Sequence, residues 1–328
     1  MEDFESMDEV TQFFSLPNDD SHLDGTEFDV ELPDLSPLCS DVIFYLLFFL
    51  ETKHVIPWLT VSKYWYERCH LVPISAFLSF NTLKKVENFV DCPQMMNLTR
   101  LKVSHVNSTT CGKWCEKISS CPQLKNVTSL DLSRSINISS GHLKQILSSP
   151  YLTKLIDLDI SNCATVGDPI SSFPHLCTIQ RLNISYNRKC NVESIVQSEI
   201  VSNLTSLNVF GVNMPNSNAK YIASSSFMQN LTELHLGFPS VKKRVRSILC
   251  KKFSDAGVES ITNSSFMRKL RYLYLKDGKV TDVGAKLLAN SELRNLLVLD
   301  LSDNNMTTEG QQLLSKSSNL SQLTLLKF

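Results

Sequence analysis

Residues 299–304 read Leu-Asp-Leu-Ser-Asp-Asn, and together with Leu296 and Met306 they form the pattern that decides the fold. Apolar residues stand at positions 296, 299, 301 and 306, and the amide of Asn304 stands where the chain must turn. Alternate side chains of a Leu-x-Leu segment point to one side of a short strand, and neighbouring strands stack about 4.8 Å apart. The stretch therefore predicts one unit of a stacked, repetitive structure.

The same apolar spacing recurs from residue 98 to residue 328, with further apolar residues three and five places after each first position. Successive copies begin 24 to 29 residues apart, with one interval of 39. Nine copies resemble the leucine-rich repeat family, which implies an α/β solenoid, a horseshoe with a parallel sheet on its concave face. The first positions are Leu98, Val127, Leu155, Ile179, Leu204, Leu231, Leu270, Leu296 and Leu320.

The second halves of several copies resemble the repeat variant that is rich in Thr-Asp-x-Gly. Residues 254–257 read Ser-Asp-Ala-Gly, residues 281–284 read Thr-Asp-Val-Gly, and residues 307–310 are a looser copy. We expect the Asp or Ser to begin the outer helix by accepting hydrogen bonds from free N–H groups. Asn187 and Asn304 are expected to bond to the backbone at the turns, with Cys163 as the variant residue at that position.

Composition indicates a soluble chain that is not secreted and has no membrane span. Its 328 residues are 42% hydrophobic, which is enough for a large core. The longest apolar run covers residues 42–50, too few to cross a bilayer, and no signal peptide precedes it. Ten cysteines in a chain of this length fit reduced thiols better than a disulfide framework. We therefore expect the protein in the cytoplasm or the nucleus.

No catalytic set, cofactor site or metal site is expected. The chain has only 10 glycines and lacks a phosphate-binding loop, Gly-x-Ser-x-Gly and His-Glu-x-x-His. Cys111, Cys115 and Cys121 lie close in sequence, but no paired Cys-x-x-Cys or histidine follows them, so we do not expect zinc there. The histidines, including His142, fall on different repeats. The sequence thus favours a binding protein over an enzyme.

The N-terminal 34 residues form an acidic tail. They contain 12 Asp and Glu and no Lys or Arg, so the remaining chain carries 32 − 21 = +11. Such a composition is typical of a disordered segment. The alternative is that Phe13 and Phe14, with their acidic neighbours, dock on a basic surface of the same molecule.

Residues 35–72 predict a small all-α module of at least two amphipathic helices. The motif residues are Leu38, Asp41-Val42, Leu46-Leu47, Leu50 and, eleven residues later, Val61-Ser62-Lys63 with Trp65. In this order they resemble an F-box, whose pattern is Leu-Pro-x-Glu-Leu, then Ile-Leu-x-x-Leu, then Val-Cys/Ser-Lys-x-Trp. Cys39 replaces the proline, and Pro57 lies where the second helix should run. The resemblance implies binding to a Skp-type adaptor of a cullin complex through Leu38, Val42, Ile43, Leu46, Leu47, Leu50, Val61 and Trp65. The alternative is a helical cap on the solenoid.

Residues 73–97 are expected to form a linking or capping helix, because Leu83, Val86 and Phe89 are spaced by three. At the other end, the last copy reaches Phe328 with no helix after its strand. We expect another element to cover that strand edge.

Residues between the strand leucines should face outward on the concave side. Acidic residues at Asp131, Asp157 and Asp159 are expected to serve as exposed recognition charge. Exposed aromatic residues bury area at low entropic cost, so we predict a target-binding site in the aromatic zone. Its members are Tyr186, Phe210, His235, Phe238, Tyr272 and Tyr274. The alternative is that some of them pack on each other or under a loop.

The 39-residue copy carries a basic insertion at residues 240–252, with six Lys and Arg in thirteen residues: Lys242, Lys243, Arg244, Arg246, Lys251 and Lys252. Such a run is typical of a solvated loop or a localisation signal. It also suits an acidic partner, a phosphorylated segment or the acidic tail, with the two arginines as phosphate ligands. Binding to anionic lipid or nucleic acid is a weaker alternative, and we do not expect it.

Together these features predict a non-catalytic substrate-recognition subunit of a cullin–RING ubiquitin ligase. The F-box-like module would bind the adaptor, and the concave face of residues 98–328 would bind an unknown target protein. The alternative is a leucine-rich repeat scaffold with no role in ubiquitin transfer, because a fold alone does not specify a function.

Overall fold

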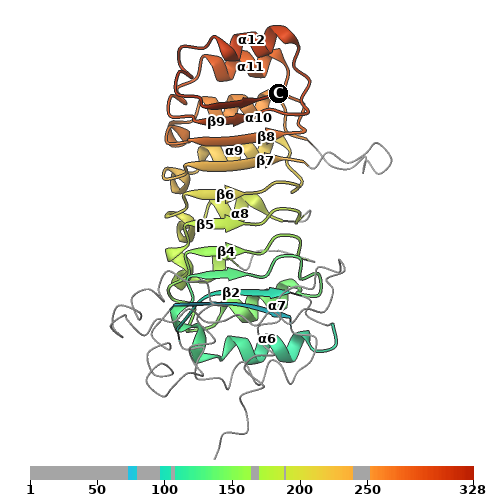
Figure 1. Ribbon diagram of the computed structural model, residues 1–328, viewed down its shortest axis with the longest axis vertical. Helices are drawn as coiled ribbons and strands as arrows, with labels where there is room; N and C mark the ends of the chain where they lie inside the picture. Colours follow the sequence, from blue (N-terminus) through green and yellow to red (C-terminus); the bar gives the residue numbers. More distant parts are fainter. Residues whose placement is uncertain (1–72, 80–96, 105–107, 164–169, 188–189, 239–251) are drawn as a thin grey trace, which may run out of the picture.

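The computed structural model describes residues 73–79, 97–104, 108–163, 170–187, 190–238 and 252–328. Within these ranges the chain forms one ten-stranded parallel sheet whose strands follow sequence order, stacked along the long axis of the molecule (Figure 1). The strands are β1 (Ile74–Ser79), β2 (Leu98–Ser104), β3 (Ser129–Asp131), β4 (Asp157–Asp159), β5 (Arg181–Asn183), β6 (Ser206–Asn208), β7 (Glu233–Gly237), β8 (Tyr272–Lys276), β9 (Val298–Asp300) and β10 (Leu325–Lys327).

Short helices connect the strands, and most neighbouring helices contact one another. The α-helices are α6 (Cys111–Ser119), α7 (Ser140–Leu147), α8 (Val192–Val196), α9 (Asn216–Ser224), α10 (Asp255–Thr262), α11 (Asp282–Ala289) and α12 (Thr308–Ser315). The 3-10 helices are η3 (Pro122–Asn126), η4 (Ile170–Ser172), η5 (Pro174–Thr178), η6 (Glu199–Val201), η7 (Ser226–Met228) and η8 (Ser265–Met267). None of the helices in the described ranges combines the length and apolar character that a bilayer span requires.

The core is a continuous stack of apolar side chains between the sheet and the helices. The central leucine of each strand from β2 to β9 is at most 2% exposed, and these leucines pair in register across the sheet. They are Leu101, Leu130, Leu158, Leu182, Leu207, Leu234, Leu273 and Leu299. The nine predicted strands correspond to β2 through β10, so the predicted solenoid is confirmed.

Strand β1 is the first departure from the sequence prediction. Residues 74–79 form a strand parallel to β2, with a register shift between Ile74 and Ser75, whereas we expected a helix from residue 73. The open edge of β2 offers unpaired backbone groups, and a strand satisfies them where a helix does not. The helical spacing at Leu83, Val86 and Phe89 lies outside the described residues, as do the acidic tail and the F-box-like module.

Asparagine side chains tie the turns of neighbouring repeats together, as expected. The side-chain oxygen of Asn187 accepts from the backbone N–H of Cys163 at 2.9 Å, and its NH₂ donates to the carbonyl of Ile160 at 2.8 Å. Asn304 repeats this arrangement, accepting from the N–H of Val280 at 3.0 Å. Each amide thus satisfies buried backbone groups of the preceding repeat, which explains its place in the pattern.

The Thr-Asp-x-Gly motif joins one outer helix to the next. Asp255 accepts from the backbone N–H of Thr281 at 2.8 Å, from its hydroxyl at 2.7 Å and from the N–H of Gly284 at 2.9 Å. A Cβ on Gly284 would lie 2.5 Å from the Asp255 carboxylate, so only glycine fits there. Asp282 holds Thr307 in the same way. We expected each aspartate to begin its own helix, but it caps the helix of the following repeat.

Asp255→Ala is therefore expected to destabilise the solenoid by about 2 to 4 kcal/mol, because three donors lose one charged acceptor. Glu259→Ala is the matched control, since Glu259 lies exposed on the same helix and its change should shift stability by less than about 0.5 kcal/mol. Denaturant unfolding of both variants measures the difference. Equal midpoints for the two variants would show that the inter-repeat cap contributes nothing.

Candidate functional site

Residues that flank the buried leucines lie on the opposite side of the sheet, which we call the sheet face. Strand pairing arranges them in two columns along the stack. The first column is Arg100, Ser129, Asp157, Arg181, Ser206, Glu233, Tyr272, Val298 and Leu325. The second column is Lys102, Asp131, Asp159, Asn183, Asn208, His235, Tyr274, Asp300 and Lys327.

The acidic residues of β3 and β4 have partners within the sheet face, two of them cationic and one an amide. Lys102 Nζ lies 2.8 Å from Asp131 Oδ2, and Arg181 forms an ion pair with Asp157. Asp159 accepts a 2.8 Å hydrogen bond from the asparagine beside it on β5. Burial raises the pKa of Asp131, but its hydrogen bonds, including that from Lys102, lower the pKa by more and keep it below 3.8. These carboxylates are half-buried and side chains from neighbouring strands pair with them, so they are less exposed than we expected.

Most residues of the second column also stand at the end of their strands, where the side chain forms a hydrogen bond that turns the backbone. Five of them accept a hydrogen bond from the backbone N–H two residues later, at 2.8 to 3.1 Å, which turns the chain away from the sheet. These five are Asp131, Asp159, Asn183, Asn208 and Asp300. His235 and Tyr274 occupy the same column on β7 and β8, where both strands continue to five residues. Among β3 to β10, these two strands are therefore the longest.

The two rings form the centre of an aromatic site. The imidazole of His235 stacks on the ring of Tyr274 with centroids 4.0 Å apart and planes 9° apart. His235 Nε2 lies 2.8 Å from Glu233 Oε1, which fixes the orientation of the imidazole. Tyr272 stands two residues before Tyr274 on the same face, and the guanidinium of Arg271 lies 5.9 Å from the Tyr272 centroid. The two strands thus place three rings beside one carboxylate, with Arg271 next to them.

The protonation states of this site are fixed by its surroundings. Burial raises the pKa of Glu233, but hydrogen bonds with His235 and Ser206 lower it by more, so the pKa lies below the usual 4.5. Burial and the nearby negative charge of Glu233 raise the pKa of Tyr274 above 10.0. At neutral pH the site therefore offers a carboxylate as acceptor and a neutral phenol as donor.

Tyr186 and Phe210 extend this site towards β5. Their rings meet edge to face with centroids 5.6 Å apart, and Tyr186 is 47% exposed. Tyr186 has a φ of +60°, in a turn where other repeats place Arg134, Asn162 or Gly211. A bulky residue in this conformation costs about 1 to 2 kcal/mol, and such strain is concentrated at functional sites. Because Arg134, Asn162, Asp277 and Asp303 also have a positive φ, this conformation belongs to the turn of the repeat. The exposure of the Tyr186 ring is what supports a binding role.

Phe238 does not belong to this surface, contrary to the sequence prediction. It is only 7% exposed, because Gly237 makes the turn with a φ of +112°, one residue earlier in the repeat than Tyr186 or Asp277 does. Lys252 lies over the Phe238 ring at 5.9 Å and pairs with Asp277 at 2.7 Å. Contacts with Phe238 and Asp277 therefore fix the position of the Lys252 side chain.

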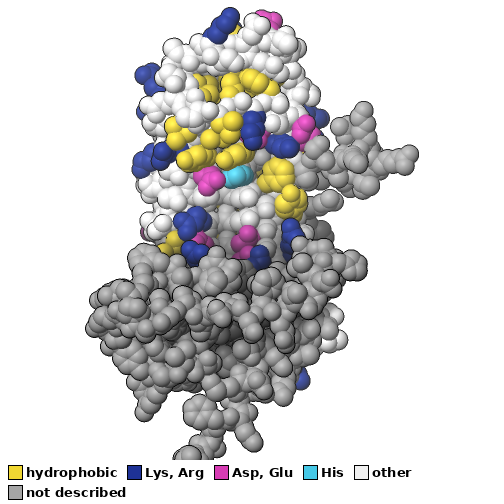
Figure 2. Space-filling view, viewed as in Figure 1, with side chains coloured by type: hydrophobic (Ala, Val, Ile, Leu, Met, Phe, Trp, Pro, Cys, Tyr) yellow, Lys and Arg dark blue, Asp and Glu magenta, His cyan; other side chains and the backbone are white. Residues whose placement is uncertain are grey.

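Three of the six predicted target-binding residues, His235, Tyr272 and Tyr274, stand in the columns of the sheet face. Tyr186 and Phe210 lie in the turns that follow β5 and β6, and their rings contact each other. We call these five residues the aromatic patch: Tyr186, Phe210, His235, Tyr272 and Tyr274. Figure 2 shows apolar side chains gathered over the upper strands, with a histidine and charged side chains beside them. We did not predict from the sequence that the guanidinium of Arg271 lies near the Tyr272 ring. The position of Arg271 directly before Tyr272 was a possible signal for this contact.

Two groups of predicted site residues lie outside the described ranges. The first is the adaptor-binding set, Leu38, Val42, Ile43, Leu46, Leu47, Leu50, Val61 and Trp65. The second is most of the basic insertion, Lys242, Lys243, Arg244, Arg246 and Lys251.

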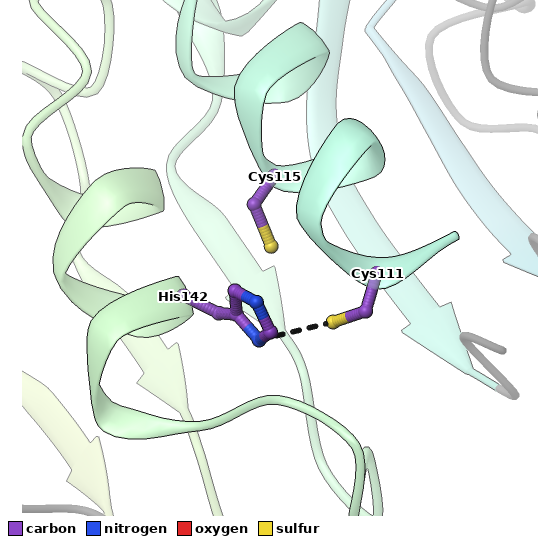
Figure 3. Close-up of side chains that lie close together, drawn as sticks. All are labelled: Cys111, Cys115 and His142. Carbon is purple, nitrogen blue, oxygen red and sulfur yellow. Dashed lines mark hydrogen bonds between the residues drawn. The ribbon is translucent and has the colours of Figure 1, made fainter. Parts of the chain in front are cut away.

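A second cluster lies away from the sheet face, between α6 and α7 (Figure 3). It consists of Cys111, Cys115 and His142, and one potential ligand atom from each lies within 4.8 Å of the others. Cys121, which lies close to these two cysteines in sequence, is not a member, because its thiol donates to Gln123 at 2.9 Å. We did not expect a metal site at these cysteines, and we did not connect His142 with them. The sequence did contain a signal for this contact. His142 follows Cys115 by 27 residues, which is close to the length of one repeat, so the two residues stand at similar positions in successive repeats.

Comparisons with known proteins agree with the repeat architecture. The family model described as Leucine Rich repeat matches residues 266–289 and 292–315, which contain β8 with α11 and β9 with α12. The chain therefore contains leucine-rich repeats, whose solenoids present extended surfaces for protein binding. The comparison with curated protein sequences finds no significant match.

Two solved structures from Listeria monocytogenes are similar to the chain. One is the internalin InlF, at 16% identity over 81% of this chain and 77% of that one, with a TM-score of 0.38. The other is internalin C2, at 19% identity over 67% of this chain and 84% of that one, also with a TM-score of 0.38. Similarity at this level carries no argument about function.

Proposed function

We propose that this protein recruits a target protein to a cullin–RING ubiquitin ligase and catalyses no reaction itself. The observation that carries target binding is the aromatic patch, where stacked and edge-to-face rings stand half exposed on a rigid sheet. Aromatic side chains with few rotatable bonds are common hot spots of protein interfaces. The charged end of the sheet face, around Asp131 and Asp157, is paired internally and contributes less.

The link to ubiquitin transfer rests on the F-box-like sequence of residues 38–65. By that resemblance, its apolar residues bind a Skp-type adaptor, which connects the chain to a cullin in the cytoplasm or nucleus. Holding a lysine of the target near a conjugating enzyme that carries ubiquitin raises the effective concentration of the two reactants. The protein would thus accelerate ubiquitin transfer through proximity alone.

The basic insertion supports a preference for targets with negative charge. Residues 240–252 interrupt the repeat directly after Phe238, so they follow β7 and its share of the aromatic patch in sequence. Arginine side chains bind phosphate in two-pronged geometry, and Arg244 and Arg246 are the candidates. An acidic or phosphorylated segment beside an apolar anchor is therefore the target chemistry that we expect.

Adaptor binding is tested with the double variant Leu46→Asp, Leu50→Asp. We expect it to lose at least about 100-fold in affinity for a Skp-type adaptor, because a charge buried in an apolar interface costs several kcal/mol. Co-purification and titration with the purified adaptor measure the loss. The unfolding midpoint of the repeats serves as the control and should stay unchanged.

Two outcomes would contradict the ligase role. One is that the wild-type chain binds no adaptor of this class, and the other is that the double variant binds as well as the wild type. Either result would leave a leucine-rich repeat scaffold whose residues 35–97 cap the solenoid. Target binding by the aromatic patch is independent of this test.

A further inference from the structure

The cluster between α6 and α7 contains a set of donors that the proposed function does not use. Cys111 and Cys115 stand one turn apart on α6, so both thiols point to the same side of the helix. His142 comes from α7 of the next repeat, and Figure 3 shows the three side chains converging on one space. Cys111 Sγ lies 3.3 Å from His142 Nδ1.

We propose that Cys111, Cys115 and His142 bind a thiophilic divalent cation of the Zn²⁺ class, which joins the two helices. Thiolate and imidazole are the ligands that Zn²⁺ prefers, at about 2.3 Å and 2.0–2.1 Å. Those bond lengths place tetrahedral ligand atoms roughly 3.5 Å apart. The Cys111–His142 separation of 3.3 Å already meets this geometry, and the full set spans no more than 4.8 Å.

Charge balance also favours a divalent cation. Two thiolates and one neutral imidazole carry a charge of −2, which a divalent ion cancels, so no net charge is left in a buried place. Cys111 and Cys115 are both at most 1% exposed, whereas His142 is half-buried. Water can therefore reach the imidazole side and complete a four-coordinate site.

The site would stabilise the N-terminal part of the solenoid. Helices α6 and α7 contact each other directly, and the cation would add a link between two successive repeats. Solenoid stability depends on interfaces between nearest neighbours, so one such link acts on both units. Without the cation, the thiol of Cys111 donates to the carbonyl of Asn137 at 3.4 Å, and His142 Nδ1 accepts from the backbone N–H of Ser139 at 3.3 Å. Binding through Cys111 Sγ and His142 Nδ1 would exchange both contacts for metal bonds.

The full chain, purified without metal, is titrated with Co²⁺ as a spectroscopic substitute for Zn²⁺. We expect one equivalent to produce thiolate-to-cobalt charge-transfer absorption together with intense visible bands, as in tetrahedral coordination. Zn²⁺ should displace the Co²⁺ and raise the unfolding midpoint of the metal-free chain. Absence of charge-transfer absorption would overturn the proposal, since the three side chains would then only form a hydrogen-bonded group.

Conservative variants locate the site among the ten cysteines. Cys115→Ser and His142→Gln should each weaken Co²⁺ binding by more than about 100-fold, because even the loss of an outer-shell partner costs 10–100-fold. Cys121→Ser is the matched control, since Cys121 is a buried thiol beside α6 outside the cluster, and it should bind Co²⁺ like the wild type. Metal-free circular dichroism confirms that the variants fold. An unchanged cobalt spectrum in both ligand variants would refute the assignment.

Discussion

Gly237→Ala is expected to destabilise the protein by about 2 to 5 kcal/mol, the sum of a left-handed backbone penalty and overpacking. A Cβ at this position would lie 2.1 Å from the carbonyl oxygen of Lys276 and 2.9 Å from its nitrogen. Backbone atoms of β8 cannot move aside without breaking the ladder that β7 and β8 share. The φ of +112° adds strain for any residue with a side chain.

Thermal and denaturant unfolding of the variant measure this loss. Gly141→Ala is the matched control, because a Cβ there would approach nothing closer than the Ser139 hydroxyl at 3.8 Å. That change lies in the first turn of α7 and should leave stability unchanged or raise it by up to about 1 kcal/mol. If both variants unfold at the wild-type midpoint, the turn at Gly237 does not constrain the sheet.

The repeat architecture was predictable because its signal is local and recurs nine times. Leu299 and Leu301 stand at fixed offsets in sequence, and burial of such alternating leucines follows directly from strand geometry. The amide of Asn304 could also be assigned, since it bonds to backbone three residues away and one repeat away. Strand β1 was missed because its sequence lacks the repeat pattern, and its pairing with β2 cannot be read from sequence.

The site was predictable only in part, because side-chain pairing across strands cannot be read from one repeat. Tyr272 and Tyr274 follow from alternation along β8, but the pairing of Asp131 with Lys102 depends on the register of two strands. Phe238 occupies a position that faces outward elsewhere and turns inward after Gly237. The contact of His142 with Cys111 likewise depends on how two outer helices stack.

Tyr274→Ala is expected to weaken target binding by about 30-fold or more, the loss typical of an interface hot spot of at least 2 kcal/mol. The substitution removes the ring that stacks on His235 and leaves a hollow in the centre of the aromatic patch. Tyr274 is half-buried, so some stability is lost as well, and binding must be compared at a temperature where both proteins are folded. A target protein captured with the wild-type chain is titrated against each purified chain, which gives the ratio of the dissociation constants.

Val283→Ala is the matched control for this prediction, because Val283 is 61% exposed on α11 and lies off the sheet face. It should bind the target like the wild type, which separates the aromatic patch from exposed apolar surface in general. Adaptor binding should be the same in all three chains, because the F-box-like module is untouched. If Tyr274→Ala keeps wild-type affinity while a patch on the helical side proves sensitive, target recognition must be assigned to that side of the solenoid.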